Sequence, residues 1–226
     1  MKIIAHIKTD FPTKFGLPRQ SGLISEICGK IIFEKKYRNP DALRGIEGFS
    51  HIWLLWQFSV AERRGGAEEW SATVRPPMLG GNKRMGVFAT RSPFRPNPIG
   101  MSAVKIEKIE LSTPQGPIIY VSGADLMDGT PIYDIKPYLP LADCIPEALG
   151  GFSENTKSRE LIVEFPENLL NLIPADKQTE LLKVLESDPR PSYQNDNERI
   201  YGFYFCCFEI LFKVNDGVLR VVEVKK

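Results

Sequence analysis

Short apolar segments recur along the first half of the chain, and residues that favour turns separate them. The segments are rich in Ile, Val and aromatic side chains, which are common in strands, and Gly, Pro, Asn or Asp bound them. This pattern predicts strands at residues 2–7, 22–34, 50–60, 101–111 and 116–124. In the fourth segment, Val104, Ile106 and Ile109 lie among charged residues, which predicts one buried and one exposed face. We therefore expect a mainly β domain built as an antiparallel sheet or barrel.

The pattern changes in the second part of the chain. Asp176 is a candidate N-cap for a helix over 177–187, where Leu181, Leu182 and Leu185 form an apolar stripe. Further on, the apolar runs 201–214 and 218–224 flank an Asn-Asp-Gly sequence, which predicts a β-hairpin.

A glycine-rich and polar stretch lies between about 141 and 159 and marks a domain boundary. The expected organisation is an antiparallel β-barrel domain over residues 1–142 and a small α+β domain over residues 143–226.

Composition adds little except for the distribution of charge. Apolar residues make up 42% of the chain, charged residues 25%, and the net charge is +1, so no global field attracts nucleic acid. Between Arg75 and Lys108, however, seven basic residues face a single acid. The positive charge is local, and any polyanion would bind there.

Targeting signals and cysteine spacing give a second set of expectations. No apolar run approaches the ~18 residues of a membrane span, and the N-terminal run is too short for a secretory signal. The four cysteines show neither disulfide-framework nor zinc spacing. We expect a soluble, cytoplasmic protein without a metal site.

The stretch GVFATRSPFRPNPIG, residues 86–100, is the most unusual in the chain. Proline fixes φ and donates no amide hydrogen bond, so Pro93, Pro96 and Pro98 hold the segment extended. Arg91 and Arg95 on such a rigid loop suit a carboxylate or phosphate, because little entropy is lost on binding. The alternative is a stiffened surface connection with solvated arginines.

Two further stretches carry polar side chains next to predicted turns. Asp125 and Asp128 flank Leu126 and Met127, where the carboxylates either bind ribose hydroxyls or an ammonium group or form local turns with their own backbone. In the stretch 14–23, Pro18, Arg19 and Gln20 form either a hairpin tip or a site that reads an adenine edge or a carboxylate.

Nucleotide-binding fingerprints of the common enzyme folds are missing. The sequence has no GxGxxG after a predicted strand and no GxxxxGK followed by Ser or Thr. This argues against a Rossmann methyltransferase, a dehydrogenase and a P-loop enzyme.

Five stretches, read together and in order, resemble the TsaA-like, or TrmO, family. They are PRQSGL, GFSHIWLLWQF, VRPPMLGGNKRMGVFATRSPFRPNPIGMSAV, DLMDGTPIYDIKPYLP and DPRPSY. The resemblance covers most of the chain, and its Arg-Pro-rich central motif is highly specific. It implies a homodimeric, S-adenosylmethionine-dependent methyltransferase built on a β-barrel. The implied substrate is tRNA with N6-threonylcarbamoyladenosine next to the anticodon, at position 37, methylated on that N6 nitrogen.

The resemblance also implies a cofactor pocket with several walls. Its residues by motif position are Pro18, Arg19, Gln20, Ser59, Val60, Arg91, Met101, Asp125, Leu126, Met127 and Asp128. Relatives often carry histidine where Ser59 stands, so a backbone contact is expected there. Arginines suit the carboxylate of the cofactor, and carboxylates suit its amine or ribose.

For tRNA, the expected contacts are Lys83, Arg84 and Arg95, because phosphate contacts dominate the affinity for nucleic acid. Methyl transfer depends first on aligning both substrates, and a modest acceptor or water can take the N6 proton. The sequence singles out no catalytic base.

Two rival functions share these binding motifs. One is a module that binds S-adenosylmethionine and RNA without turnover, and the other is a methyltransferase with a different substrate.

Overall fold

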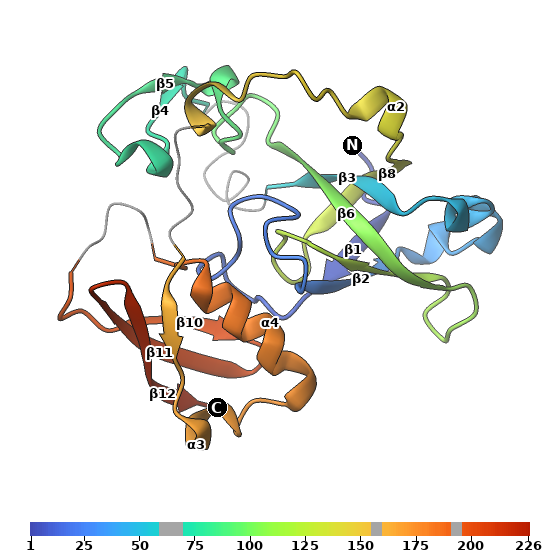
Figure 1. Cartoon of the computed structure of the whole chain (residues 1–226). Coiled ribbons are helices and arrows are strands. Elements are labelled where there is room, and N and C mark those ends of the chain that lie inside the picture. The colour runs from blue at the N-terminus through green and yellow to red at the C-terminus, as the bar shows by residue number, and fades with distance from the viewer. Residues whose placement is uncertain (59–69, 155–159, 191–195) are drawn as a thin grey trace.

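The computed structural model describes residues 1–58, 70–154, 160–190 and 196–226, and it confirms a mainly β fold (Figure 1). The strands of the first part are β1 (Ala5–Lys8), β2 (Cys28–Phe33), β3 (His51–Gln57), β4 (Thr73–Val74), β5 (Met85–Gly86), β6 (Ile99–Glu110), β7 (Ile118–Ser122) and β8 (Pro131–Pro137). The second part contains α2 (Pro140–Asp143), β9 (Ile162–Glu164), α3 (Glu167–Leu170), α4 (Ala175–Glu186), β10 (Tyr201–Phe205), β11 (Phe208–Asn215) and β12 (Val218–Lys225).

Six strands form a closed barrel in the order β1-β2-β7-β6-β3-β8, and all their pairings are antiparallel. Closure leaves no unpaired sheet edge. The strands β4 and β5 form a separate two-stranded sheet beside the barrel. The predicted antiparallel barrel is therefore confirmed.

Alternation of side chains fills the barrel. Ile52, Leu54 and Trp56 of β3 are buried, and so are the residues opposite them on the neighbouring β6, namely Val104, Ser102 and Gly100. Val104 faces inward as predicted, but the register of β6 with β7 shifts between Ile106 and Lys108. Ile106 and Ile109, which were predicted on the same buried face, are only half-buried. The register shift breaks the period of two beyond Ile106.

Two strand predictions in the barrel need correction. The segment predicted as a strand from residue 22 forms turns up to residue 27, and β2 begins at Cys28. The strand β8 was not predicted, because Gly129 and Pro131 suggested a turn. The turn is present, but Pro131 is the first residue of β8, a position where a strand tolerates the missing amide.

The second part of the chain packs α4 on a four-stranded sheet in the order β10-β11-β12-β9. Its short strand β9 pairs with β12 in parallel and was not predicted. The predicted turn between β11 and β12 is confirmed, with Asp216 and Gly217 both at positive φ. The other predicted hairpin strand, 201–214, is in fact two strands, because Cys206 adopts a φ of 53° and reverses the chain.

The helix forms where the sequence predicts it, but its N-cap and its buried face differ from the prediction. Pro174 precedes the first turn of α4, and Asp176 lies inside that turn rather than capping it. The buried face consists of Glu180, Leu181, Val184 and Leu185, so Val184 takes the place predicted for Leu182.

One hydrophobic cluster runs through the barrel and the second sheet. The Phe11 and Phe205 rings meet edge to face with centroids 5.4 Å apart, and the Cys206 amide donates to the Asp10 carbonyl at 2.7 Å. A Cβ at Gly16 would overlap the Phe203 ring.

The predicted division of the chain into domains at residues 142 and 143 remains a prediction. No helix in the described ranges is long and apolar enough to cross a membrane.

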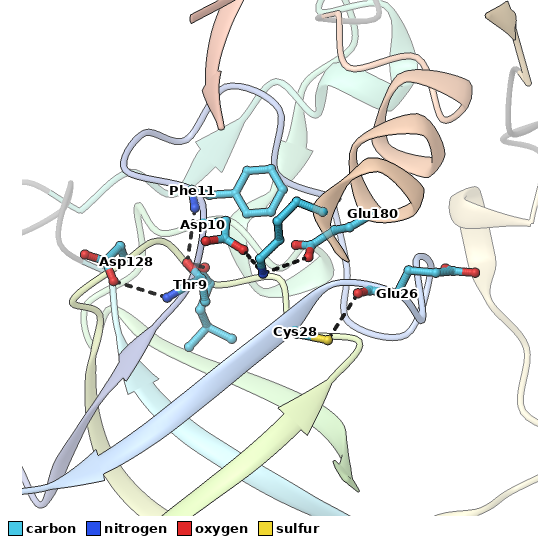
Figure 2. A network of polar contacts seen from close by, with 9 residues as sticks. Thr9, Asp10, Phe11, Glu26, Cys28, Asp128 and Glu180 are labelled. Carbon is cyan, nitrogen blue, oxygen red and sulfur yellow. Dashed lines mark hydrogen bonds and ion pairs between the residues drawn. The ribbon is translucent and has the colours of Figure 1, made fainter. Parts of the chain in front are cut away.

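Charged side chains are buried where α4 meets the end of β1 (Figure 2). Lys177 pairs with Asp10 and lies 3.5 Å from Glu180. Burial disfavours the Lys177 ammonium, but pairing with Asp10 outweighs this and raises its pKa. The Glu180 side chain is 5% exposed, and its Oε1 has no hydrogen-bond partner within the described residues. The pKa of Glu180 is raised to about 7, because burial and the nearby Asp10 charge raise it more than Lys177 lowers it.

This raised pKa predicts a pH-dependent stability. The folded state binds a proton at Glu180 more tightly than the unfolded state does. The stability that this binding adds is fully present below the unfolded pKa, near 4.5, and is lost as the pH rises through about 7. The loss is roughly 2 to 3 kcal/mol, or roughly 4 to 12 °C in Tm. Because Glu180→Gln keeps a neutral side chain, its Tm relative to the wild type should rise by this amount between pH 5 and pH 8 in thermal melts.

Glu186→Gln is the matched control, because Glu186 lies on the same helix in an exposed pair with Lys183. Its Tm difference from the wild type should stay nearly constant over the same pH range. A constant difference for Glu180→Gln would contradict a buried, proton-binding Glu180.

Candidate functional site

The Arg-Pro-rich loop is held by contacts within itself. A 3-10 turn over Val87–Ala89 opens it, and the Thr90 hydroxyl donates to the Val87 carbonyl at 2.8 Å. Arg95 then donates to the Thr90 carbonyl at 2.9 Å. The loop therefore leaves β5 and turns once. It bends again at Pro93 and over 95–97, where the Ile99 amide donates to the Asn97 carbonyl at 2.8 Å, so it is not extended throughout as the prolines predict.

Arg91 extends from this loop to the segment around Pro18. Its guanidinium donates to the side-chain oxygen of Gln20, and the Gln20 amide nitrogen donates to the Arg19 carbonyl at 2.6 Å. Arg91 is exposed, so its other donors face solvent. The structure thus brings together two of the three stretches that sequence analysis selected.

Asp125 belongs to the same place. The Trp56 indole donates to the Ser102 hydroxyl at 2.9 Å, and that hydroxyl donates to Asp125 Oδ1 at 2.6 Å. Gly100 makes the relay possible, because a Cβ there would overlap the Trp56 ring. The carboxylate is therefore oriented by a chain of hydrogen bonds that starts in the barrel core.

Burial and charge act in opposite directions on this carboxyl group. Burial raises the pKa of Asp125, while the hydrogen bonds from Ser102 and from the backbone of Ser21 and the positive charge of Arg91 lower it, with burial prevailing. The Gly22 amide donates to the Gly123 carbonyl at 2.9 Å, which places the stretch of Gln20, the partner of Arg91, beside the segment that carries Asp125.

Asp128 faces a different way from Asp125. Its Oδ1 accepts from the Thr9 amide at 3.1 Å (Figure 2). Its Oδ2 accepts from the Lys8 ammonium at 3.2 Å. The Thr9 hydroxyl donates to the Leu126 carbonyl at 3.0 Å, and the Leu126 side chain is in the core. Asp128 thus ties the 125–128 turn to the end of β1.

The remaining predicted cofactor residues differ in exposure and in contacts. Met101 on β6 is 50% exposed, next to the buried Ser102, and Met127 and Pro18 are half-buried. Arg19 is exposed and donates to the Arg190 carbonyl of the second part of the chain at 3.4 Å. Ser59 and Val60 lie outside the described residues.

The predicted tRNA contacts lie around the small β4–β5 sheet and the loop that follows it. Lys83 and Arg84 are exposed in the connection between these strands, and Arg84 donates to the Thr73 hydroxyl at 2.9 Å. The half-buried Arg95 lies in the proline loop. Along the chain, Lys83 and Arg84 therefore precede Arg91, and Arg95 follows it.

Sequence reasoning missed the support of Asp125. Ser102, Gly100 and Trp56 are separated in sequence, and only the pairing of Trp56 with Gly100 across β3 and β6 shows that they meet. The available signal was the pair of small residues, Gly100 and Ser102, at alternate positions near the start of β6.

The relay makes a testable prediction for Asp125. Ser102→Ala removes a hydrogen bond that stabilises the ionised carboxylate, so the pKa of Asp125 should rise further. It also leaves the Trp56 indole N–H without its acceptor, which should cost roughly 1 to 3 kcal/mol of stability. A carbon-detected NMR titration of aspartate carboxyl groups, with Asp125→Asn to assign the signal, measures the first effect.

Ser122→Ala is the matched control, since the buried Ser122 donates to Glu107 at 2.5 Å in the same barrel. It should leave the Asp125 titration unchanged. An Asp125 pKa that is unchanged or lower in Ser102→Ala would exclude the relay.

Family models match nearly all of the chain. The tRNA-methyltransferase O N-terminal domain matches residues 6–144, and the TrmO C-terminal domain matches residues 159–226. The two matches include all the stretches that carry the predicted cofactor and tRNA contacts.

Individual proteins agree with the family models. The tRNA (adenine(37)-N6)-methyltransferase of Escherichia coli K12 is 40% identical over 230 residues, which cover 98% of this chain and 96% of that protein. An S-adenosyl-L-methionine-binding protein of Archaeoglobus fulgidus is 36% identical over 150 residues, or 66% of this chain and 96% of the relative. A crystal structure of TrmO superposes with a TM-score of 0.79 at 31% identity, covering 99% of this chain and 97% of that one. The chain belongs to the TrmO family of tRNA methyltransferases.

Proposed function

We propose that the protein uses S-adenosylmethionine to methylate N6 of threonylcarbamoyladenosine at position 37 of tRNA. Membership of the family supports the coarser activity, that of a tRNA (adenine-N6)-methyltransferase. The observation that carries the site assignment is the convergence of Gln20, Arg91 and Asp125, which come from three distant stretches of the chain.

The residues at this place fit the chemistry of the cofactor. S-adenosylmethionine supplies a methyl group on a sulfonium and carries a carboxylate, an amine, a ribose and an adenine. Arg91 offers solvent-facing donors for the carboxylate, and Asp125 offers a pre-oriented acceptor for the amine or ribose hydroxyls. The exposed Met101 offers apolar contact for a ring.

These contacts act by positioning rather than by acid–base chemistry. Ser102 fixes Asp125, and Gln20 fixes Arg91, so the groups that bind the cofactor lose little freedom when they do so. Holding two substrates in register supplies a large share of the rate of a displacement reaction. Asp128 and Leu126 contribute by fixing the 125–128 turn against β1.

The tRNA is proposed to lie against the basic side chains that follow the cofactor residues in the chain. Lys83, Arg84 and Arg95 would contact phosphates, and residues 1–142 would form the catalytic domain. Residues 143–226 would form a second domain that contacts the catalytic one through Asp10 and Lys177.

A homodimer in the cytoplasm completes the proposal. The segment that follows β8 exposes large apolar side chains, namely Leu139, Leu141, Ile145 and Leu149. Exposed apolar side chains gathered in one short segment are typical of an interface, and a second copy of the chain would bury them.

The substrate is tested by incubating the protein and S-adenosylmethionine with two tRNA preparations, one with threonylcarbamoyladenosine and one without it. Nucleoside mass spectrometry should show a methyl-mass gain only in the modified nucleoside. A gain in unmodified adenosine would refute the substrate assignment. No gain, with cofactor binding confirmed by calorimetry, would favour a binding module without turnover or a methyltransferase for another substrate.

The division between cofactor and tRNA residues is tested separately. Charge reversal in the double variant Lys83→Glu/Arg84→Glu should weaken tRNA binding about tenfold or more and reduce its salt slope by about two, because two phosphate contacts are lost. Calorimetric affinity for S-adenosylmethionine should change less than about twofold.

Lys35→Glu/Lys36→Glu is the matched control, because it makes the same change in charge on an exposed turn across the barrel (Figure 1). It should leave tRNA binding nearly unchanged. Equal loss of tRNA and cofactor binding in the Lys83 and Arg84 variant would refute the division.

A further inference from the structure

Two large aromatic side chains lie exposed beside the β4–β5 sheet. Trp70 is 45% exposed and Phe88 is 72% exposed. Their rings are nearly parallel, with an interplanar angle of 21° and centroids 6.3 Å apart. Single exposed aromatic residues are common on protein surfaces, but here two stacked rings together keep apolar faces in contact with water, which is costly.

Hydrogen bonds hold the backbone around this aromatic pair. The Ser71 amide donates to the Phe94 carbonyl and the Val87 amide to the Ala72 carbonyl, each at 3.0 Å. The β4–β5 pairing follows directly, with Thr73 opposite Gly86. Trp70 and Phe88 therefore precede and follow the same hydrogen-bonded unit, which holds the rings in place relative to each other.

Positive charge borders the aromatic pair. The Arg95 guanidinium lies 5.9 Å from the centroid of the Phe88 ring, and Arg84 contacts Thr73 on β4. Residues 70–106 contain no aspartate or glutamate, whereas Glu68 and Glu69 directly precede Trp70 in the sequence. An aromatic pair with an arginine against one ring is complementary to an unpaired nucleotide, whose base stacks on the rings while its phosphate meets the arginines.

A second copy of the chain is the alternative occupant, because Trp, Phe and Arg are also enriched at protein interfaces. The exposed segment 139–149 already offers aliphatic side chains for such an interface.

We propose that Trp70 and Phe88 form a stacking platform for an unpaired base of the tRNA anticodon loop. This inference rests on the proposed function. It adds a contact to a base of the tRNA, whereas Lys83, Arg84 and Arg95 contact its phosphates. Splayed bases of single-stranded loops commonly stack on aromatic side chains. Because stacking tolerates any base, the platform would bind the loop without reading its sequence.

The test uses a 17-nucleotide anticodon-arm hairpin with threonylcarbamoyladenosine at position 37, and a second hairpin whose other loop nucleotides are abasic. Fluorescence anisotropy compares the wild type with Trp70→Leu/Phe88→Leu, which keeps apolar side chains but removes both rings. The variant should bind the intact hairpin about tenfold more weakly, since stacking contributes this much per base. With the abasic loop, the variant and the wild type should bind alike.

Further readouts separate stacking from other effects. The salt slope of the variant should equal that of the wild type, because no phosphate contact is removed. Phe49→Leu makes the same change at another exposed ring and should bind both hairpins like the wild type. Thermal melts and calorimetry with S-adenosylmethionine should show intact folding and cofactor binding.

Several outcomes would overturn the platform. Equal affinity of the variant and the wild type for the intact loop would do so, as would an equal loss on both hairpins. A change in oligomeric state of the variant by light scattering would assign the rings to a protein interface. Failure of the wild type to bind either hairpin would overturn the proposed function together with the platform.

Discussion

Closure of the barrel by β8 is the constraint on which the other features depend. This strand pairs with β1 on one side and β3 on the other, so the turn before it must lie between the ends of those strands. Asp128 then reaches β1, and Asp125 reaches Ser102 on β6. The two carboxylates are only three residues apart but serve different neighbours, because Asp125 precedes the turn over 127–130 and Asp128 lies within it.

The same geometry links the core of the barrel to its surface chemistry. Trp56 is buried, yet its indole N–H must find an acceptor, and Ser102 provides one. The serine hydroxyl can donate only one hydrogen, and it donates that hydrogen to Asp125. Satisfying a polar group in the core thereby orients a carboxylate at the proposed cofactor site.

The contact between the two halves of the molecule follows a different principle. Phe11 packs on Phe205 of β10, and Lys177 of α4 pairs with Asp10 beside it. Glu180 is buried at this junction. A buried carboxyl group next to another acid retains its proton more strongly, while Lys177 compensates in part. The junction therefore couples protonation to the stability of the assembled chain.

The sequence by itself determined the mainly β class, most of the barrel strands, the Asn-Asp-Gly turn and the proline-rich loop that carries Arg91. These depend on local alternation, on proline and on positive φ, which are readable within a few residues. Only the tertiary structure revealed β8, the divergence of Asp125 and Asp128, and the relay from Trp56. Each of these depends on pairing between strands far apart in sequence, and local patterns do not encode which strands will be neighbours.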